Sequence, residues 1–282
     1  TDIRNFSQIG KDNNMSAQNV IRLMSKFMPI FHNTTHLPEA IGIDEFRGNT
    51  DGNKFQVAIT NLKTHKIIDV VSARSEEALR HFFRNITNTK DVKLVTMDLS
   101  LFFKNIIQDT FPNAKIIADT FHFTRLMHWA LDNVRKNIQK NLPTDMRLYF
   151  KHSKSVLHKR IQQLDMDKYQ QLCRMLDYDE NLKWAYSIVQ MLFQVIDEEN
   201  PDKKVMLFKE FMTYSSKCEL PEFNKHLQTY FKWHKYIINS FYTNYSNGIT
   251  EGLNTKIKTL KRISFGFRNF KNFRLRILMA CS

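Results

Sequence analysis

Four acidic residues stand where carboxylates could act together on a metal ion. Asp44, Asp98 and Asp119 follow or end apolar runs of the sequence. Glu251 stands near the start of a segment with helical periodicity late in the chain. Three carboxylates in one pocket repel each other and stay ionised only with cations between them. Mg²⁺ suits such a pocket because it takes oxygen ligands and is often shared with substrate phosphates; we expect Mn²⁺ to substitute. These residues therefore predict two-metal chemistry at a phosphate, in which a water or 3′-hydroxyl is activated and the leaving oxygen stabilised.

Each acid also has a structural interpretation. Asp44 could begin a turn, Asp98 could cap the helix that follows it, and Glu251 could be a first-turn acid favoured by the helix dipole. Asp119, with His122 three residues on, is the rival to Asp98 as second carboxylate. Asp119 and His122 could bind the metal, or could orient a metal ligand by hydrogen bonding to it. They could also form a hydrogen-bonded structural corner.

The stretch after Glu251 is basic and carries no further acid. Its phenylalanines, Phe265, Phe267, Phe270 and Phe273, alternate with cations, and such interleaving fits a nucleic-acid surface. The alternative is that the phenylalanines are core and the cations a solvated face. The residues predicted to hold a DNA backbone are Lys256, Lys258, Lys261, Arg262, Arg268, Lys271 and Arg274.

Composition narrows the class of protein. The chain has 282 residues, 42% of them hydrophobic, which is ample for a packed core, and its net charge of +14 favours a polyanionic partner. No apolar run is long enough to span a membrane. The cysteines, Cys173, Cys218 and Cys281, are too far apart in sequence for a disulfide framework or a zinc motif, so we expect a reducing, intracellular setting. The chain opens without Met, so we expect it to begin part-way through a longer protein.

The elements that must position the acids form an α/β pattern. Strands are predicted over 39–46, ending on the pair Asp44-Glu45, and over 54–62, 65–74, 93–99 and 114–123, with helices over 75–86 and 100–111. Three strands joined by turns, followed by helix, strand, helix and strand, indicate a mixed sheet whose last strands need helical crossovers. The acids fall at the ends of the first, fourth and fifth strands, where functional groups of open α/β sheets gather.

Helices account for most of the remaining chain. Residues 125–245 show helical patterns broken at three prolines, which indicates a helical insertion before the segment with Glu251. Residues 5–33 predict two helices, the second capped by Ser16. They could be the end of a helix-turn-helix that presents polar residues to DNA, or an ordinary helical linker.

Several of these stretches carry a family resemblance. IGIDEF, VTMD with its following helix, FPNAKIIADTFHFTRLMHWALDNVRK and SNGITEGLNTKIKTLKRISFGFRNFKNFRLRIL resemble the catalytic domain of the ISL-three family of bacterial insertion-sequence transposases, over roughly residues 15–282. The resemblance implies a ribonuclease-H-like core in which the first and fourth strands are neighbours, with a helical insertion before the final Glu. By position, the DDE triad falls on Asp44, Asp98 and Glu251, and Asp119 fills the D-x-FH position.

The resemblance also implies an activity. Members are enzymes that cut DNA at terminal inverted repeats and transfer the strand to target DNA with Mg²⁺. The alternatives are a non-catalytic DNA-binding remnant and a ribonuclease-H-like nuclease. Expected partners are double-stranded DNA at the inverted repeats and target, and a second copy of the chain in a synaptic complex, but no membrane. We expect a bacterial cytoplasmic location at the nucleoid.

The family also suggests how the chain is divided. Full-length members carry an N-terminal cysteine-rich zinc element and a complete helix-turn-helix; this sequence shows only the last helices of such a region, so we expect no zinc in this chain. The predicted divisions are a helical segment (1–36), the first part of the core (37–124), the insertion (125–245), and the final core helix with its basic tail (246–282).

Overall fold

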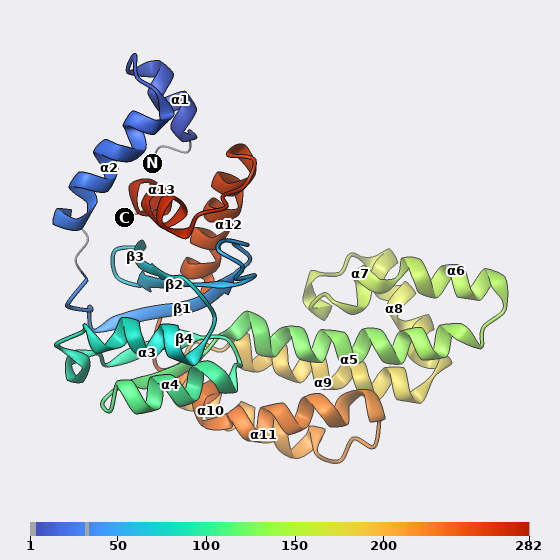
Figure 1. Ribbon diagram of the computed structural model, residues 1–282. Helices are drawn as coiled ribbons and strands as arrows, with labels where there is room; N and C mark the ends of the chain where they lie inside the picture. The colour runs from blue at the N-terminus through green and yellow to red at the C-terminus, as the bar shows by residue number, and fades with distance from the viewer. Residues whose placement is uncertain (1–3, 32–33, 282) are drawn as a thin grey trace. The chain divides into compact units, whose positions relative to one another are not determined.

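The computed structural model describes residues 4–31 and 34–281. Residues 32 and 33, at the end of the expected N-terminal helical segment, lie outside that description. The chain divides into two compact units. The sheet unit comprises Thr1–Asp119 and Tyr245–Ser282, and the helical unit comprises Thr120–Asn244. The sheet unit is therefore built from both ends of the chain, as Figure 1 shows by colour.

One mixed sheet forms the centre of the sheet unit, with strand order β3-β2-β1-β4-β5. Its strands are β1 (Ala40–Phe46), β2 (Gln56–Asn61), β3 (Lys66–Val71), β4 (Leu94–Met97) and β5 (Lys115–Ala118). The first three pair antiparallel, whereas β4 pairs parallel with both β1 and β5. The predicted mixed α/β sheet is confirmed, including the neighbouring first and fourth strands.

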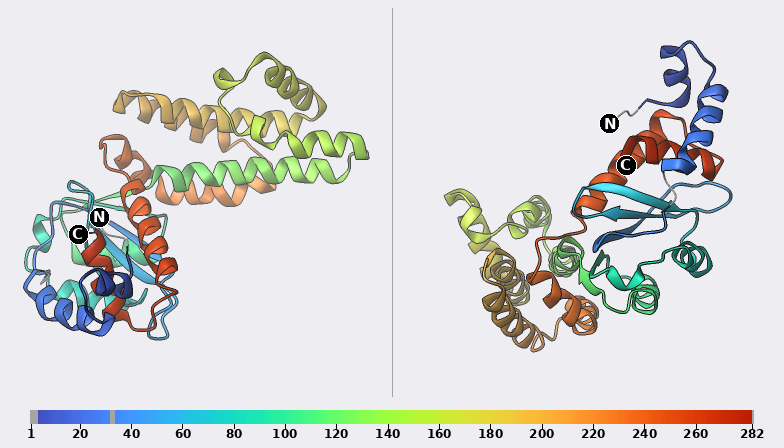
Figure 2. Two further views of the ribbon diagram at one scale, coloured as in Figure 1. Left: turned by 90° about the horizontal axis from the view of Figure 1, so that it is seen from above. Right: turned by 90° about the vertical axis from the view of Figure 1, so that its left-hand side faces the viewer.

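Helices cover both faces of this sheet (Figures 1 and 2). On one face lie the crossover helices α3 (Glu76–Arg84) and α4 (Leu101–Thr110), and on the other lie α12 (Gly248–Ile263) and α13 (Phe270–Cys281). The short 3-10 helix η1 (Thr89–Asp91) precedes β4. Ser75 and Ser100 cap the crossovers, since their hydroxyl oxygens accept backbone N–H groups at 3.2 and 3.4 Å. Because Ser100 caps α4, capping of that helix does not explain the presence of Asp98.

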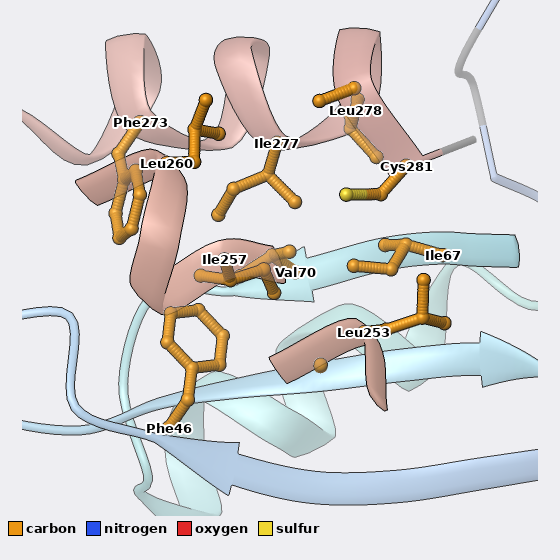
Figure 3. Packing of buried hydrophobic residues seen from close by; sticks show 12 residues of the cluster. Phe46, Ile67, Val70, Leu253, Ile257, Leu260, Phe273, Ile277, Leu278 and Cys281 are labelled. Atoms are coloured by element: carbon orange, nitrogen blue, oxygen red, sulfur yellow. The ribbon is translucent and has the colours of Figure 1, made fainter. Parts of the chain in front are cut away.

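Apolar side chains of α12 and α13 pack onto β1, β2 and β3 (Figure 3). In α12 they recur at helical spacing, so one stripe of the helix is buried while the opposite side stays exposed. The fully or nearly buried members of the cluster are Phe46, Ala58, Ile67, Val70, Leu253, Ile257, Leu260, Phe273, Ile277, Leu278, Ala280 and Cys281. This packing holds the C-terminal helices against the strands that carry the N-terminal acid.

The predicted fifth strand is wrong beyond Ala118. Strand β5 ends there, and α5 (Thr120–Lys140) begins two residues later, so His122 lies on a helix rather than a strand. Within the segment ADTFHF, residues 120–123 alternate polar and apolar, which resembles a strand over a short window. The buried residues Phe123, Met127 and Ala130 follow helical spacing, and their burial along α5 decides the conformation.

Two short helices at the N-terminus pack on α13. They are α1 (Phe6–Asp12) and α2 (Ala17–Phe31), as predicted, and the Ser16 hydroxyl accepts the Asn19 N–H at 3.1 Å. Phe6 and Val20 meet Leu275 of α13 in a small apolar cluster. The N-terminal segment is therefore anchored to the C-terminal end of the chain.

The helical unit consists of α-helices and one 3-10 turn: α5, α6 (Thr144–His152), α7 (Lys154–Leu157), η2 (Ile161–Gln163), α8 (Met166–Tyr178), α9 (Glu180–Asp197), α10 (Pro201–Ser215) and α11 (Pro221–Phe241). Helix α5 packs against both α9 and α11. A buried ion pair stabilises α5, in which the Arg135 guanidinium binds Asp132 at 2.7 Å. Throughout the described ranges, every helix is too short or too polar to cross a bilayer.

Candidate metal centre and DNA interface

Three aspartates occupy equivalent positions on neighbouring parallel strands. The last register partners are Ile43 with Met97 and Met97 with Ala118. Asp44, Asp98 and Asp119 each follow one of these residues, so they form the next row across β1, β4 and β5. Adjacent strands lie about 4.8 Å apart, and residues in register face the same side of a sheet. Strand β1 itself continues to Phe46, so Asp44 lies within the strand rather than at its end.

The row brings acidic groups close together. Carboxylate oxygens of Asp98 and Asp119 lie within 4.8 Å of each other, and Asp119 is 3% exposed. His122 follows Asp119 in the first turn of α5 and is a third potential metal ligand. Asp44 is 8% exposed. A cation bound between two carboxylates this close would offset the repulsion between their negative charges.

Two buried asparagines of the α12 segment bind these aspartates. The Asn254 side-chain amide donates to Asp44 at 2.7 Å, and the Asn247 amide donates to Asp98 at 3.2 Å. The Asn247 carbonyl oxygen in turn accepts the Thr96 hydroxyl at 3.3 Å. Sequence reasoning missed both asparagines, although their spacing of seven residues on one helix face was a readable signal.

Glu251 lies on the same side of α12 as these asparagines. It follows Asn247 by four residues and precedes Asn254 by three, so successive turns of the helix place it between them. It is half-buried in the first turn of α12. Among the residues that the structure describes, no group of three or more metal-ligand side chains within 4.8 Å contains Asp44 or Glu251. The assignment of Asp44, Asp98 and Glu251 as the triad therefore stays a prediction, as does the rival role of Asp119.

A glycine lets α12 approach the sheet. A β-carbon on Gly42 would lie 2.3 Å from the Thr250 hydroxyl oxygen and 2.5 Å from that of Thr60. Those two hydroxyls hydrogen-bond to each other at 2.8 Å. The absence of a side chain at Gly42, two residues before Asp44, is thus what allows α12 to bring its polar face down to the acidic row.

The predicted DNA-contacting residues differ in their surroundings. Five are exposed: Lys256, Lys258, Arg262, Arg268 and Lys271. Lys261 is half-buried and donates to the Arg47 carbonyl at 3.2 Å; burial, with the nearby Arg47 charge, lowers the pKa of its ammonium group. Arg274 binds the buried Asp69 through two nitrogens, at 2.6 and 2.7 Å. The structure thus gives Arg274 a partner within the fold, while its contact with DNA stays a prediction.

The phenylalanines of the basic stretch also differ in how far they are buried. Phe273 is fully buried, and Phe267 and Phe270 pack partly buried against the same core, so the core interpretation holds for these three. Phe265 is 98% exposed. Arg276, another cation of this stretch, is buried and donates to the Arg4 carbonyl at 2.7 Å, so it belongs to the interior.

The fold and the acidic row define an α/β protein compatible with the ribonuclease-H-like transposases. A family model described as a transposase, that of the ISL-three DDE transposases, matches residues 41–277. The chain therefore belongs to this family. Members of this family are described as transposases.

Two curated proteins are similar to this chain in sequence. The transposase for insertion sequence element IS1001 of Bordetella parapertussis is 23% identical over 247 residues, which is 86% of this chain and 61% of the relative. A protein named ATP-dependent protease, from Lactococcus lactis subsp. lactis, is 36% identical over 107 residues, or 38% of this chain and 33% of the relative. The chain thus spans less than two thirds of each relative, and the protease name describes only that relative.

Proposed function

We propose that this chain is the catalytic part of a DDE transposase that cuts DNA at the ends of an insertion sequence and joins the freed 3′ end to target DNA. The observation that carries the proposal is the row of aspartates across β1, β4 and β5, with the polar face of α12 bound to it. Family membership supports this reaction class, and the row of aspartates supports its location.

The donor set fits hard divalent cations. Asp44, Asp98 and Glu251 offer only carboxylate oxygens, which suit Mg²⁺ or Mn²⁺. A cation would also relieve the repulsion between the carboxylates of Asp98 and Asp119, whose oxygens lie within 4.8 Å of each other. A bound pair of such ions would activate the attacking water or 3′-hydroxyl and stabilise the leaving oxygen. Asp119 is the alternative second ligand, because it shares the row and the burial of its neighbours.

The chain's own residues would orient these groups. Asn254 donates to one carboxylate oxygen of Asp44, whose other oxygen accepts the Glu45 N–H at 2.7 Å, and Asn247 donates to a carboxylate oxygen of Asp98. Glu251, on the helix that carries both amides, would approach the row from the side of α12. Because the helix is seated against Gly42, the three acids would keep their relative positions as DNA binds.

DNA would lie along the exposed basic side of α12 and the residues beyond it. Lys258 and Arg262 are four apart and share that side with Glu251, so a backbone held by them would pass the acidic row. We further propose that the helical unit is the insertion of the family, that α1 and α2 are the end of a helix-turn-helix, and that two copies act together at paired DNA ends. The exposed residues Gln18, Asn19 and Arg22 would face DNA from α2.

A cleavage and strand-transfer assay tests this function. It would use the purified protein, DNA carrying the ends of its element, and Mg²⁺ or Mn²⁺. Alanine variants of Asp44, Asp98, Asp119 and Glu251 are compared with wild type, and DNA binding is measured in parallel. We expect the Asp44, Asp98 and Glu251 variants to bind DNA without cutting it.

Other outcomes separate the alternatives. An inactive Asp119→Ala beside an active Asp98→Ala would assign the second carboxylate to Asp119. Wild-type protein that binds DNA but never cuts it with either metal would favour a DNA-binding remnant. Cutting without joining would favour a ribonuclease-H-like nuclease.

A further inference from the structure

One aromatic side chain projects alone from the basic region. Phe265, in the turn between α12 and α13, is 98% exposed, the highest value among the large hydrophobic residues that the structure describes as exposed. Its neighbours Phe267 and Phe270 pack against the core. Exposing a whole phenyl ring to water is unfavourable. Because the Phe265 ring does not pack in the core, folding alone does not explain why this residue is a phenylalanine.

The backbone at Phe265 is also unusual. Its φ of 53° lies in the left-handed region, which favours glycine. The turn is a Schellman motif, in which Gly266 N–H donates to the Lys261 carbonyl at 2.9 Å and Phe265 N–H to the Arg262 carbonyl at 3.1 Å. Glycine normally occupies the place that Phe265 takes here. A bulky residue held in this conformation is strained, and such strain concentrates at functional sites.

The position of Phe265 relative to Glu251 is set by α12. Along one side of this helix lie Glu251, Lys258 and Arg262, at spacings of seven and four residues, and the helix ends just before Phe265. At 1.5 Å per residue, Arg262 is roughly 16 Å from Glu251 along the helix axis, and Phe265 is about 20 Å away. That length corresponds to about six base pairs of duplex.

We propose that Phe265 is a DNA-contacting residue that inserts against unstacked bases about six base pairs from the scissile phosphate. The inference rests on the proposed function, because it takes the position of the DNA from the acidic row and the basic side of α12. Apolar side chains flanked by cations are suited to this task, since the cations hold phosphates while the ring replaces a lost base-stacking contact. A strained turn that points the ring outward presents it without a conformational change.

The first test measures binding to short duplexes in EDTA, where no cutting occurs. One duplex is fully paired, and the other has two adjacent mismatched pairs, one containing 2-aminopurine. Wild type should bind the mismatched duplex at least about fivefold more tightly, which is the gain in affinity expected from one base stacked on an aromatic ring. It should also quench the fluorescence of 2-aminopurine. Phe265→Ala should lose the preference and the quenching, and Phe265→Trp should keep both.

Controls separate stacking from charge and from folding. Arg262→Ala should weaken binding to both duplexes and lower the salt slope by about one, whereas Phe265→Ala should leave the slope unchanged. Phe265→Gly relieves the left-handed strain, so it should melt a few degrees above wild type yet show the same loss as alanine. Phe231→Ala removes a phenyl ring that is 50% exposed in the helical unit, and it should behave as wild type.

The outcomes distinguish this inference from the proposed function. If wild type cuts element ends but Phe265→Ala and Phe265→Gly match it in cutting, duplex preference and quenching, the inference is wrong while the transposase proposal stands. Loss of self-association in Phe265→Ala, with DNA binding intact, would instead assign the ring to a contact between protein copies and also overturn the inference. Wild type that binds neither duplex would overturn both proposals.

Discussion

Replacing Arg274 with alanine should destabilise the sheet unit, because it would leave Asp69 buried without its cation. Asp69 has a side chain 5% exposed, on β3, and Arg274 binds both of its oxygens from α13. Two further donors remain in the variant: the Thr34 hydroxyl at 3.1 Å and the Val70 N–H at 2.7 Å. The charge would thus be hydrogen-bonded but unpaired.

The size of the effect follows from this environment. Removing one partner of a buried ion pair costs about 3–5 kcal/mol. Here the Arg274 side chain is 32% exposed and a cavity of about 270 Å³ adjoins the pair, so water could partly hydrate Asp69. Together with the two remaining donors, this reduces the expected loss to about 2–3 kcal/mol. At a typical urea dependence, the unfolding midpoint should fall by about 1 M.

Urea denaturation followed by far-UV circular dichroism measures this loss. Trp129, Trp184 and Trp233 all lie in the helical unit, so tryptophan fluorescence reports on the other unit in the same samples. Lys271→Ala is the matched control, because Lys271 is an exposed cation one turn earlier on α13; its stability should stay within about 0.5 kcal/mol of wild type.

The double variant Asp69→Asn/Arg274→Ala decides the cause. Removing the buried charge as well should recover much of the stability lost in Arg274→Ala. If Arg274→Ala unfolds at the wild-type urea concentration while DNA binding falls, the ion pair is unimportant for folding and Arg274 acts at the DNA surface. An unrescued double variant would mean that packing, rather than charge, was lost.

The remaining predictions concern the acidic row and the helical unit. Gly42→Ala should displace α12 through a clash with Thr250 and abolish stabilisation by Mn²⁺ in thermal melts, while Gly252→Ala, whose β-carbon meets nothing within 4 Å, should melt at or above the wild-type temperature. Asn254→Ala should reduce cleavage about 10–100-fold and raise the Mn²⁺ concentration needed for it; an unchanged Mn²⁺ requirement would contradict a positioning role. Burial, with nearby positive charges, lowers the pKa of His158 to about 4, so the folded helical unit binds fewer protons than the unfolded chain between pH 4 and 6.5. Its stability should therefore fall as the pH drops through that window, by about 1–2 kcal/mol after allowance for the half-exposed ring, and urea midpoints from tryptophan fluorescence that are equal at pH 7 and 4.5 would refute this.

Local patterns accounted for most of the fold. The short apolar runs of the strands, the serine caps of α3 and α4, and the helical crossovers before the last two strands are all short-range signals, and the structure agrees with them. The exception was the segment after Ala118. There, four residues with alternating polarity (120–123) fit a strand, and only their continuation into the buried stripe of α5 makes them helical. Short windows cannot distinguish these two periods.

Residue types and their order were enough to identify the candidate acids, the basic surface and the family to which they point. Their chemistry is intrinsic to residue type, and strand ends predict where such residues collect. Only the tertiary structure decided which partners each one has. Asn254 meets Asp44 across 210 positions of the chain, and Asp69 takes Arg274 across 205. Of the four interleaved phenylalanines, packing buries three at least in part and leaves Phe265 in water. Hydrogen bonding, burial and ion pairing act between neighbours in space, and the sheet register and the docking of α12 and α13 choose those neighbours.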